Sequence, residues 1–268
     1  MINLTEINYP FYSYAPLHYV ANVFAILVYI SIIAWFIQSL NIQCRPPVMV
    51  ILIFTSHVAL NIELVLRGIY DVSVLNTKSF YRVTAPMLSI PPRLLLLAHY
   101  RYLVELRGKK ARGIFDRVIN IIVLIVVITA DVLHVFANEL AFKSNYIHLS
   151  FRLRQASAGL ILALALLYYV VWYFATANTH RSYILTLLGI TSTCVLIEAV
   201  YVQLISIPKY FFILNQNEVW FYLGHLIPIV IALVTWTIFH PWRLLLLPKR
   251  YTGSHETRKV LISVTSTD

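Results

Sequence analysis

The sequence predicts an all-α integral membrane protein, a seven-transmembrane helix bundle with its N-terminus outside and its C-terminus in the cytoplasm. Of its 268 residues, 60% are hydrophobic and 12% are charged, whereas about 25% charged is typical of soluble domains. Seven apolar runs each approach the roughly 20 residues that a helix needs to cross the hydrocarbon core. The basic residues fall mostly in the connections between these runs.

The predicted spans are separated by short connections that leave no room for a soluble domain. We therefore expect an extracellular N-terminus at 1–16, a bundle at 17–247 and a cytoplasmic tail at 248–268. Within the bundle, the apolar runs place the spans at 17–40, 47–66, 83–103, 118–140, 156–176, 183–207 and 219–239.

The distribution of Lys and Arg sets the predicted orientation, because cytoplasmic loops carry an excess of both. One side of the membrane receives 13 basic residues, which are Arg45, Arg101, Arg107, Lys109, Lys110, Arg112, Arg117, Arg181, Arg243, Lys249, Arg250, Arg258 and Lys259. The other side receives six, which are Lys78, Arg82, Lys143, Arg152, Arg154 and Lys209. The side with 13 is predicted to be cytoplasmic.

The basic balance of the chain, a formal charge of +10, does not indicate a nucleic-acid-binding protein. Such a protein gathers its Lys and Arg on a water-exposed fold, and here they lie in short loops between apolar runs. Cys44 and Cys194 predict neither a disulfide nor a metal site. We expect no cofactor.

Ionisable residues inside the predicted spans are the most informative feature. A charge at the bilayer centre costs about 2.5–3.5 kcal/mol on insertion scales, so such residues usually face the bundle interior and have partners. Glu63 and Arg67 are four residues apart on one helix and are predicted to pair. Arg93 is then free to pair with Asp131 or Glu198.

These residues and their neighbours are predicted to meet in the outer half of the bundle. One interpretation is structural, in which ion pairs and hydrogen bonds between helices fix the bundle. We also expect His57 and His99 to be packed inside the bundle. The other is a polar pocket for the head of an amphiphile, in which three carboxylates against two arginines favour a cationic or zwitterionic head. The predicted substrate-binding residues are Glu63, Arg67, Arg93, Asp131, His134, Glu198, Tyr222 and His225.

The last span carries a family resemblance. Glu218, the aromatic residues after it, His225, Pro228 and the final His240-Pro241 resemble the last span of the fungal RTA-like family, seven-helix proteins described as lipid-translocating exporters. The family usually has an acid in place of His225. Further residues fit in order along the chain: Tyr14-Ala15-Pro16, Asn22, Glu63, Ala85-Pro86, Asp131-Val132 and Glu198.

The resemblance implies a function in moving amphiphiles, or in resistance to them, mostly at the plasma membrane. The implied ligands are sphingoid long-chain bases, sterol-like drugs or porphyrins, and the implied partners are membrane lipids. An exporter of this kind is not an enzyme.

Two other classes of protein remain as alternatives. Seven spans also suit a receptor or sensor for a lipid-like ligand, although Arg101 lacks the preceding acid of the common receptor motif and the last span lacks Asn-Pro-x-x-Tyr. A membrane metallohydrolase would require Asp131, His134 and His225 to converge on one metal ion.

Overall fold

The computed structural model describes residues 9–11, 14, 16–42, 47–106, 114–176 and 182–241. The elements in this part of the chain are all helical. Predictions for the basic connection at 107–112 and for the tail at 248–268 lie outside the described residues. The elements are α1 (His18–Ile42), α2 (Pro47–Ile69), α3 (Val72–Leu75), α4 (Lys78–Leu106), α6 (Ile114–Leu140), η2 (Ser144–Tyr146), α7 (Ile147–Thr176), α8 (Ser182–Ile205), α9 (Pro208–Leu214), α10 (Glu218–Phe221), η3 (Tyr222–Leu226) and α11 (Ile227–Ile238).

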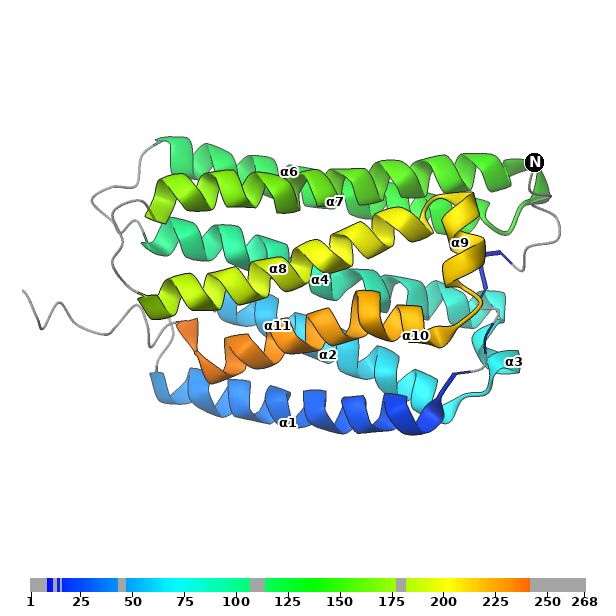
Figure 1. Ribbon diagram of the computed structural model, residues 1–268, viewed down its shortest axis with the longest axis horizontal. Coiled ribbons are helices and arrows are strands. Elements are labelled where there is room, and N and C mark those ends of the chain that lie inside the picture. Colours follow the sequence, from blue (N-terminus) through cyan, green and yellow to red (C-terminus); the bar gives the residue numbers. More distant parts are fainter. Residues whose placement is uncertain are drawn as a thin grey trace, which may run out of the picture.

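In the described part of the chain, seven long helical runs lie roughly side by side along the bundle, the seventh made of α10, η3 and α11 in succession (Figure 1). The short helices α3 and α9 lie at the end where α1 begins (Figure 1). The π-helical segment η3 is a single wider turn within the seventh run. Segments of this type frequently occur at functional sites.

Each predicted span overlaps one of these runs, but three helices begin four or more residues earlier than predicted. Helix α4 begins at Lys78 rather than residue 83, α6 at Ile114 rather than residue 118, and α7 at Ile147 rather than residue 156. Arg152 and Arg154, which the sequence analysis places in an outer loop, are therefore part of α7. The assumption that basic residues mark a loop is wrong here, because one of them is accommodated inside the bundle.

Six runs of the described chain are long and apolar enough to cross a membrane, and α4 is the long helix outside this set. Its three prolines and Arg93 lower its hydropathy. Helix α4 packs against α2, α6, α7 and α8. A helix covered by protein on several sides does not need the apolar exterior of a helix that faces lipid.

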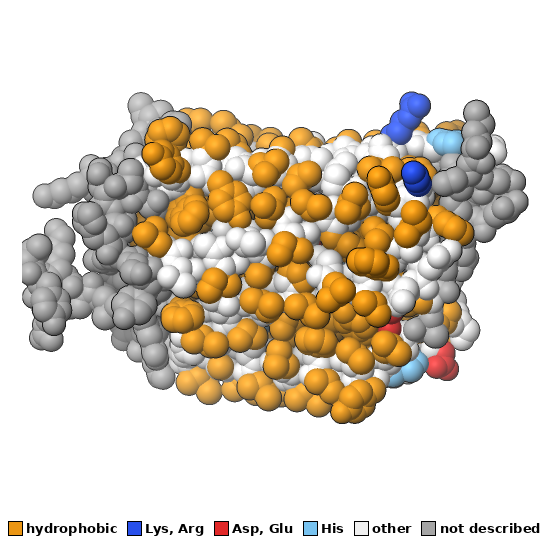
Figure 2. Space-filling model, viewed as in Figure 1, with side chains coloured by type: hydrophobic (Ala, Val, Ile, Leu, Met, Phe, Trp, Pro, Cys, Tyr) orange, Lys and Arg blue, Asp and Glu red, His pale blue; other side chains and the backbone are white. Residues whose placement is uncertain are grey.

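The outer surface is apolar along much of its length, and the charged side chains visible in Figure 2 lie near the end that carries α3 and α9. Helix α6 shows this arrangement most clearly, since Ile121, Ile125, Ile128 and Phe136 are all exposed. A soluble protein rarely exposes apolar surface this extensive. The fold is therefore that of an all-helical membrane protein.

Buried polar side chains join the helices in the opposite half of the bundle. His57 Nε2 lies 3.0 Å from Ser31 Oγ and 3.3 Å from Thr237 Oγ1, so it links α2 to α1 and α11. His99 Nε2 lies 2.6 Å from Thr191 Oγ1 and links α4 to α8. The prediction that His57 and His99 are packed is confirmed.

The described N-terminal residues pack against the bundle end. The Tyr9 ring stacks on Phe151 at 4.2 Å, and its hydroxyl lies 2.6 Å from Ser150 Oγ. Ser150 donates its own proton to the Ala137 carbonyl at 2.7 Å, so Tyr9 is the donor to Ser150. Burial raises the pKa of the Tyr9 phenol, which keeps this donor protonated.

Candidate functional site

A cavity of about 100 Å³ lies inside the bundle between α4, α6, α7, α8 and η3. A water molecule needs only about 10–15 Å³ of such space, so the cavity holds several waters or a small polar group. Pro10 and Phe211 line it at the end of the bundle that carries α9. The described part of its wall contains two arginines, two histidines and one glutamate: Arg93, Arg154, His134, His225 and Glu198.

Arg93 stands near the middle of α4 and is held at both ends of its guanidinium. Its Nη1 donates to Asp131 Oδ1 of α6 at 2.5 Å, and its Nη2 donates to Ser157 Oγ of α7 at 3.1 Å. Ser157 in turn donates to the Ala130 carbonyl at 2.7 Å. The Arg93 side chain is thus fixed in a buried position by contacts from two neighbouring helices.

Arg154 occupies the same wall closer to the α9 end. Its Nη2 donates to the Tyr81 hydroxyl of α4 and, at 2.8 Å, to Asn138 Oδ1 of α6. Its guanidinium carbon lies 4.8 Å from the centre of the Tyr9 ring. Arg154 therefore joins three helices and the N-terminal segment while it lines the cavity.

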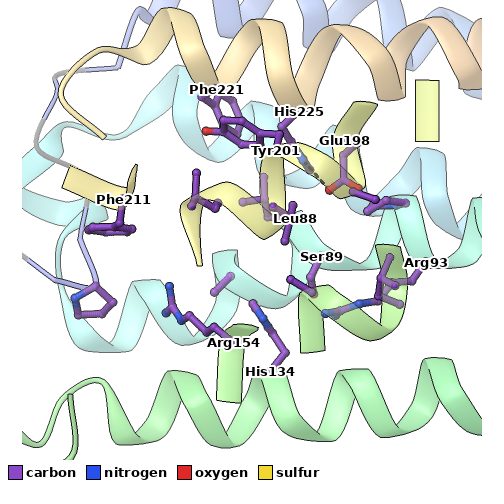
Figure 3. A pocket seen from close by; sticks show the side chains of 18 of the residues that line it. Leu88, Ser89, Arg93, His134, Arg154, Glu198, Tyr201, Phe211, Phe221 and His225 are labelled. Atoms are coloured by element: carbon purple, nitrogen blue, oxygen red, sulfur yellow. Dashed lines mark hydrogen bonds and ion pairs between the residues drawn. The ribbon is translucent and has the colours of Figure 1, made fainter. Parts of the chain in front are cut away.

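His134 lies between the two arginines (Figure 3). Along α6, Asp131 precedes it by three residues and Asn138 follows it by four, so the three side chains leave the helix at neighbouring positions of its surface. Asp131 contacts Arg93 and Asn138 contacts Arg154. His134 makes no hydrogen bond to another residue in the described part of the chain, and it lines the cavity.

The opposite wall is built by α8 and η3 (Figure 3). His225 Nδ1 lies 3.1 Å from Glu198 Oε1, and both residues are buried. The His225 ring stacks on Phe221 with centroids 5.4 Å apart. Its Nε2 is buried and has no hydrogen-bond partner among the described residues, which is uncommon for a buried polar atom.

A second polar cluster, separate from the cavity, is formed by Glu63, Arg67, Glu218 and Tyr222. Arg67 pairs with Glu63, lies 3.6 Å from Glu218 Oε1 and covers the Phe221 ring at 3.9 Å. Glu218 also accepts from Leu17 N at 2.5 Å and from the Tyr222 hydroxyl at 3.2 Å. This second cluster ties α1, α2 and α10 together, and Phe221 connects it to the cavity wall.

The structure brings together only part of the predicted site. Arg93, His134, Glu198 and His225 line the cavity, whereas Glu63, Arg67 and Tyr222 belong to the second cluster. Asp131 is not among the residues that line the cavity; it pairs with Arg93, and 45% of its side chain is exposed. The helices thus distribute the predicted residues over two clusters, and substrate binding by these residues stays a prediction.

Arg154 is the charged residue on the described cavity wall that the sequence did not predict. The available signal was the spacing of Ser150, Arg154 and Ser157, which places three polar side chains on one face of an extended α7. Tyr81 and Asn138, which hold Arg154, were also not predicted.

Among the described residues, no three His, Cys, Asp or Glu side chains lie close enough together to hold a metal ion. His134 and His225 stand on opposite walls of the cavity, and Asp131 is not among the residues that line it. The convergence that a metallohydrolase would require is not found in this part of the chain.

Gly224 of η3 is required by the close approach of Tyr201, another cavity-lining residue. A Cβ atom at Gly224 would collide with the Tyr201 ring. Gly224→Ala should therefore lower the free energy of unfolding by about 1–3 kcal/mol, as expected for overpacking. Gly189→Ala in α8 is the control, because a Cβ there meets nothing within 4 Å.

The control substitution should have the opposite sign, since Ala stabilises a helix interior by roughly 0.5–1 kcal/mol relative to Gly. Unfolding of the purified variants in detergent would measure both effects. Equal stability of the two variants would contradict the close packing of Tyr201 on Gly224.

Comparisons with known proteins provide no relative for this chain. No family model, curated protein or solved structure matches it. The resemblance to the RTA-like family therefore stays a prediction, and the site must be interpreted from its own geometry.

Proposed function

We propose that this protein is a seven-span membrane protein that takes the polar head of an amphiphilic lipid into the cavity and moves it across or out of the bilayer. The observation that carries the proposal is a cavity whose described wall contains two arginines, two histidines and one glutamate, inside a bundle whose outer surface is apolar. A lipid head crosses a bilayer slowly because it must leave water. The cavity provides polar partners at a depth where the membrane has none.

The proposed topology counts α4 as a span in addition to the six apolar runs. Helix α4 is 29 residues long, which is enough to cross a bilayer, and it packs against four long helices. With an odd number of spans, the start of α1 and the end of α11 lie on opposite sides of the membrane. In Figure 1 they lie at opposite ends of the bundle. The excess of basic residues in alternate connections supports an outside N-terminus.

The proposed path begins at the end that carries α9 and the N-terminal segment. Arg154 lies in the first turns of α7, while Arg93 lies near the middle of α4. The polar wall therefore extends from the outer end of the bundle to about half its depth. Leu88, Ile161 and Ile205 also line the cavity and would contact the first carbons of the tail.

The resemblance of the last span to the RTA-like family supports the same function and, by implication, a plasma-membrane location. The proposed ligands of the protein are membrane lipids or amphiphilic small molecules. The sensor alternative uses the same cavity but requires no transfer of the ligand.

Filling the cavity tests the proposal. Ala158 of α7 lines the cavity and is buried, so Ala158→Leu places three additional carbons in it. Transfer of a fluorescent long-chain lipid between the leaflets of reconstituted vesicles should slow by about tenfold or more, a factor that corresponds to roughly 1.4 kcal/mol. Ala156→Leu, at an exposed position on the same helix, should leave the rate unchanged.

Stability must be measured on the same preparations. The Ala158→Leu side chain occupies existing space, so its thermal unfolding should match that of the control. An unchanged transfer rate in a folded Ala158→Leu variant would refute transport through the cavity. Binding without transfer in the wild-type protein would instead favour the sensor alternative.

A further inference from the structure

The cavity has a charge pattern that the sequence did not predict. The sequence favoured a cationic or zwitterionic head because it counted Glu63, Asp131 and Glu198 as pocket residues. Glu63 belongs to the second cluster, and Asp131 pairs with Arg93 from outside the cavity lining, so Glu198 is the acidic residue on the described cavity wall. Arg93 and Arg154 are the basic residues on that wall.

The two signs of charge are also separated in space. Arg93, His134 and Arg154 lie in a row on the wall formed by α4, α6 and α7 (Figure 3). Glu198 lies on the opposite wall, where His225 Nδ1 donates to it at 3.1 Å. The carboxylate is thus directed toward a partner of its own, which leaves one wall dominated by nitrogen donors.

The three side chains of this row line the same small cavity, which directs them toward a common space. Arg93 of α4 is also joined to α7, because it contacts Ser157, which lies three residues after Arg154. His134 stands between the two arginines on α6, within electrostatic reach of both. Tyr81 and Asn138 hold Arg154 at the cavity wall.

We propose that Arg93, His134 and Arg154 form an oxyanion site that binds the phosphate or carboxylate head of an anionic amphiphile. Guanidinium groups match the planar oxygen pairs of phosphate and carboxylate, and the imidazole of His134 supplies a further donor. This inference rests on the proposed function, because the proposed function identifies the molecule that carries the anionic head as a lipid of the surrounding membrane. An anionic head replaces the cationic or zwitterionic head that the sequence favoured.

The size and lining of the cavity agree with a head that carries a chain. A volume of about 100 Å³ exceeds what one or two waters require and accommodates a head of a few heavy atoms. Ala85, Leu88, Pro92 and Ile161 line the same space. They provide apolar contacts for the carbons next to the head, which inorganic phosphate would not use.

The test measures binding of four probes to the full-length protein in lipid nanodiscs. Dodecyl phosphate, dodecylamine and dodecanol share one chain and differ in the charge of the head, and inorganic phosphate has no chain. Dodecyl phosphate should bind at least about tenfold more tightly than the amine or the alcohol, since a hydrogen bond to a charged group contributes about this factor or more.

Variants then locate the binding site. Arg154→Gln and His134→Leu should each weaken binding of dodecyl phosphate by about tenfold or more, whereas Arg154→Lys should keep the preference for the anion. Arg82→Gln is the matched control. Arg82 also joins α4 to α6, through Glu139 at 2.5 Å, but it lies on the surface outside the cavity.

Each outcome separates the inference from the proposed function. Tight binding of dodecylamine without binding of dodecyl phosphate would overturn the oxyanion site and leave lipid binding in place. Inorganic phosphate binding as tightly as dodecyl phosphate would support the oxyanion site and overturn the lipid function. Failure of all four probes would overturn both. Dodecyl phosphate binding that is unchanged in folded Arg154→Gln and His134→Leu variants would overturn the site.

Discussion

Replacing Arg67 with Met should lower the free energy of unfolding by about 3–5 kcal/mol, the cost of removing one member of a buried ion pair. Arg67 is 3% exposed, and it balances Glu63 and Glu218, which are 1% and 3% exposed. The substitution leaves two buried carboxylates close together without their cation. Removal of the guanidinium also uncovers the Phe221 ring that lies against it.

The loss of Arg67 is measured by unfolding the purified variant in mixed detergent micelles. Arg82→Met is the control, because the Arg82–Glu139 pair is about half exposed at both residues and exposed pairs contribute little. Substitution of all three charges, as Arg67→Met with Glu63→Gln and Glu218→Gln, should recover much of the lost stability. A triple variant no more stable than Arg67→Met would show that the charges are not the cause.

The Arg93–Asp131 pair should show the second large effect, this time as a coupling between two residues. Asp131→Leu leaves the buried Arg93 guanidinium without its 2.5 Å partner and should lower stability by about 3–5 kcal/mol. Arg93→Leu leaves Asp131 as a charge on the apolar outer face of α6 and should also destabilise the bundle. The double variant removes both charges and should be more stable than Asp131→Leu alone.

A double-mutant cycle measures this coupling directly. The double variant has a further use, because it separates folding from ligand binding. It should fold but bind dodecyl phosphate more weakly than the wild-type protein, since Arg93 belongs to the proposed oxyanion site. Strictly additive losses from the two single substitutions would contradict the pairing of Arg93 with Asp131.

Local spacing predicted one part of the polar structure correctly. Glu63 and Arg67 are four residues apart, which places them on the same side of any helix, so their pairing follows from helix geometry alone. The alternative partners of Arg93 lie on two different helices. Sequence spacing gives no preference between them, and the structure pairs Arg93 with Asp131.

The sequence alone determined the helical class of this protein, its apolar exterior and the approximate extent of its long helices. These properties depend on the length and apolarity of each run, which are read along the chain. The depth of each ionisable residue follows in the same way from the rise of a helix.

Only the tertiary structure decided which ionisable residues share a cavity. That choice depends on how each helix is rotated about its own axis, and an apolar helix carries little sequence information about its rotation. The rotation of α6 places His134 on the cavity wall, whereas Asp131, three residues earlier, does not line the cavity and is 45% exposed. The extension of α7 to Ile147 adds Arg154 to the same wall, because packing against Tyr81 and Asn138 provides the partners that an arginine inside the bundle requires.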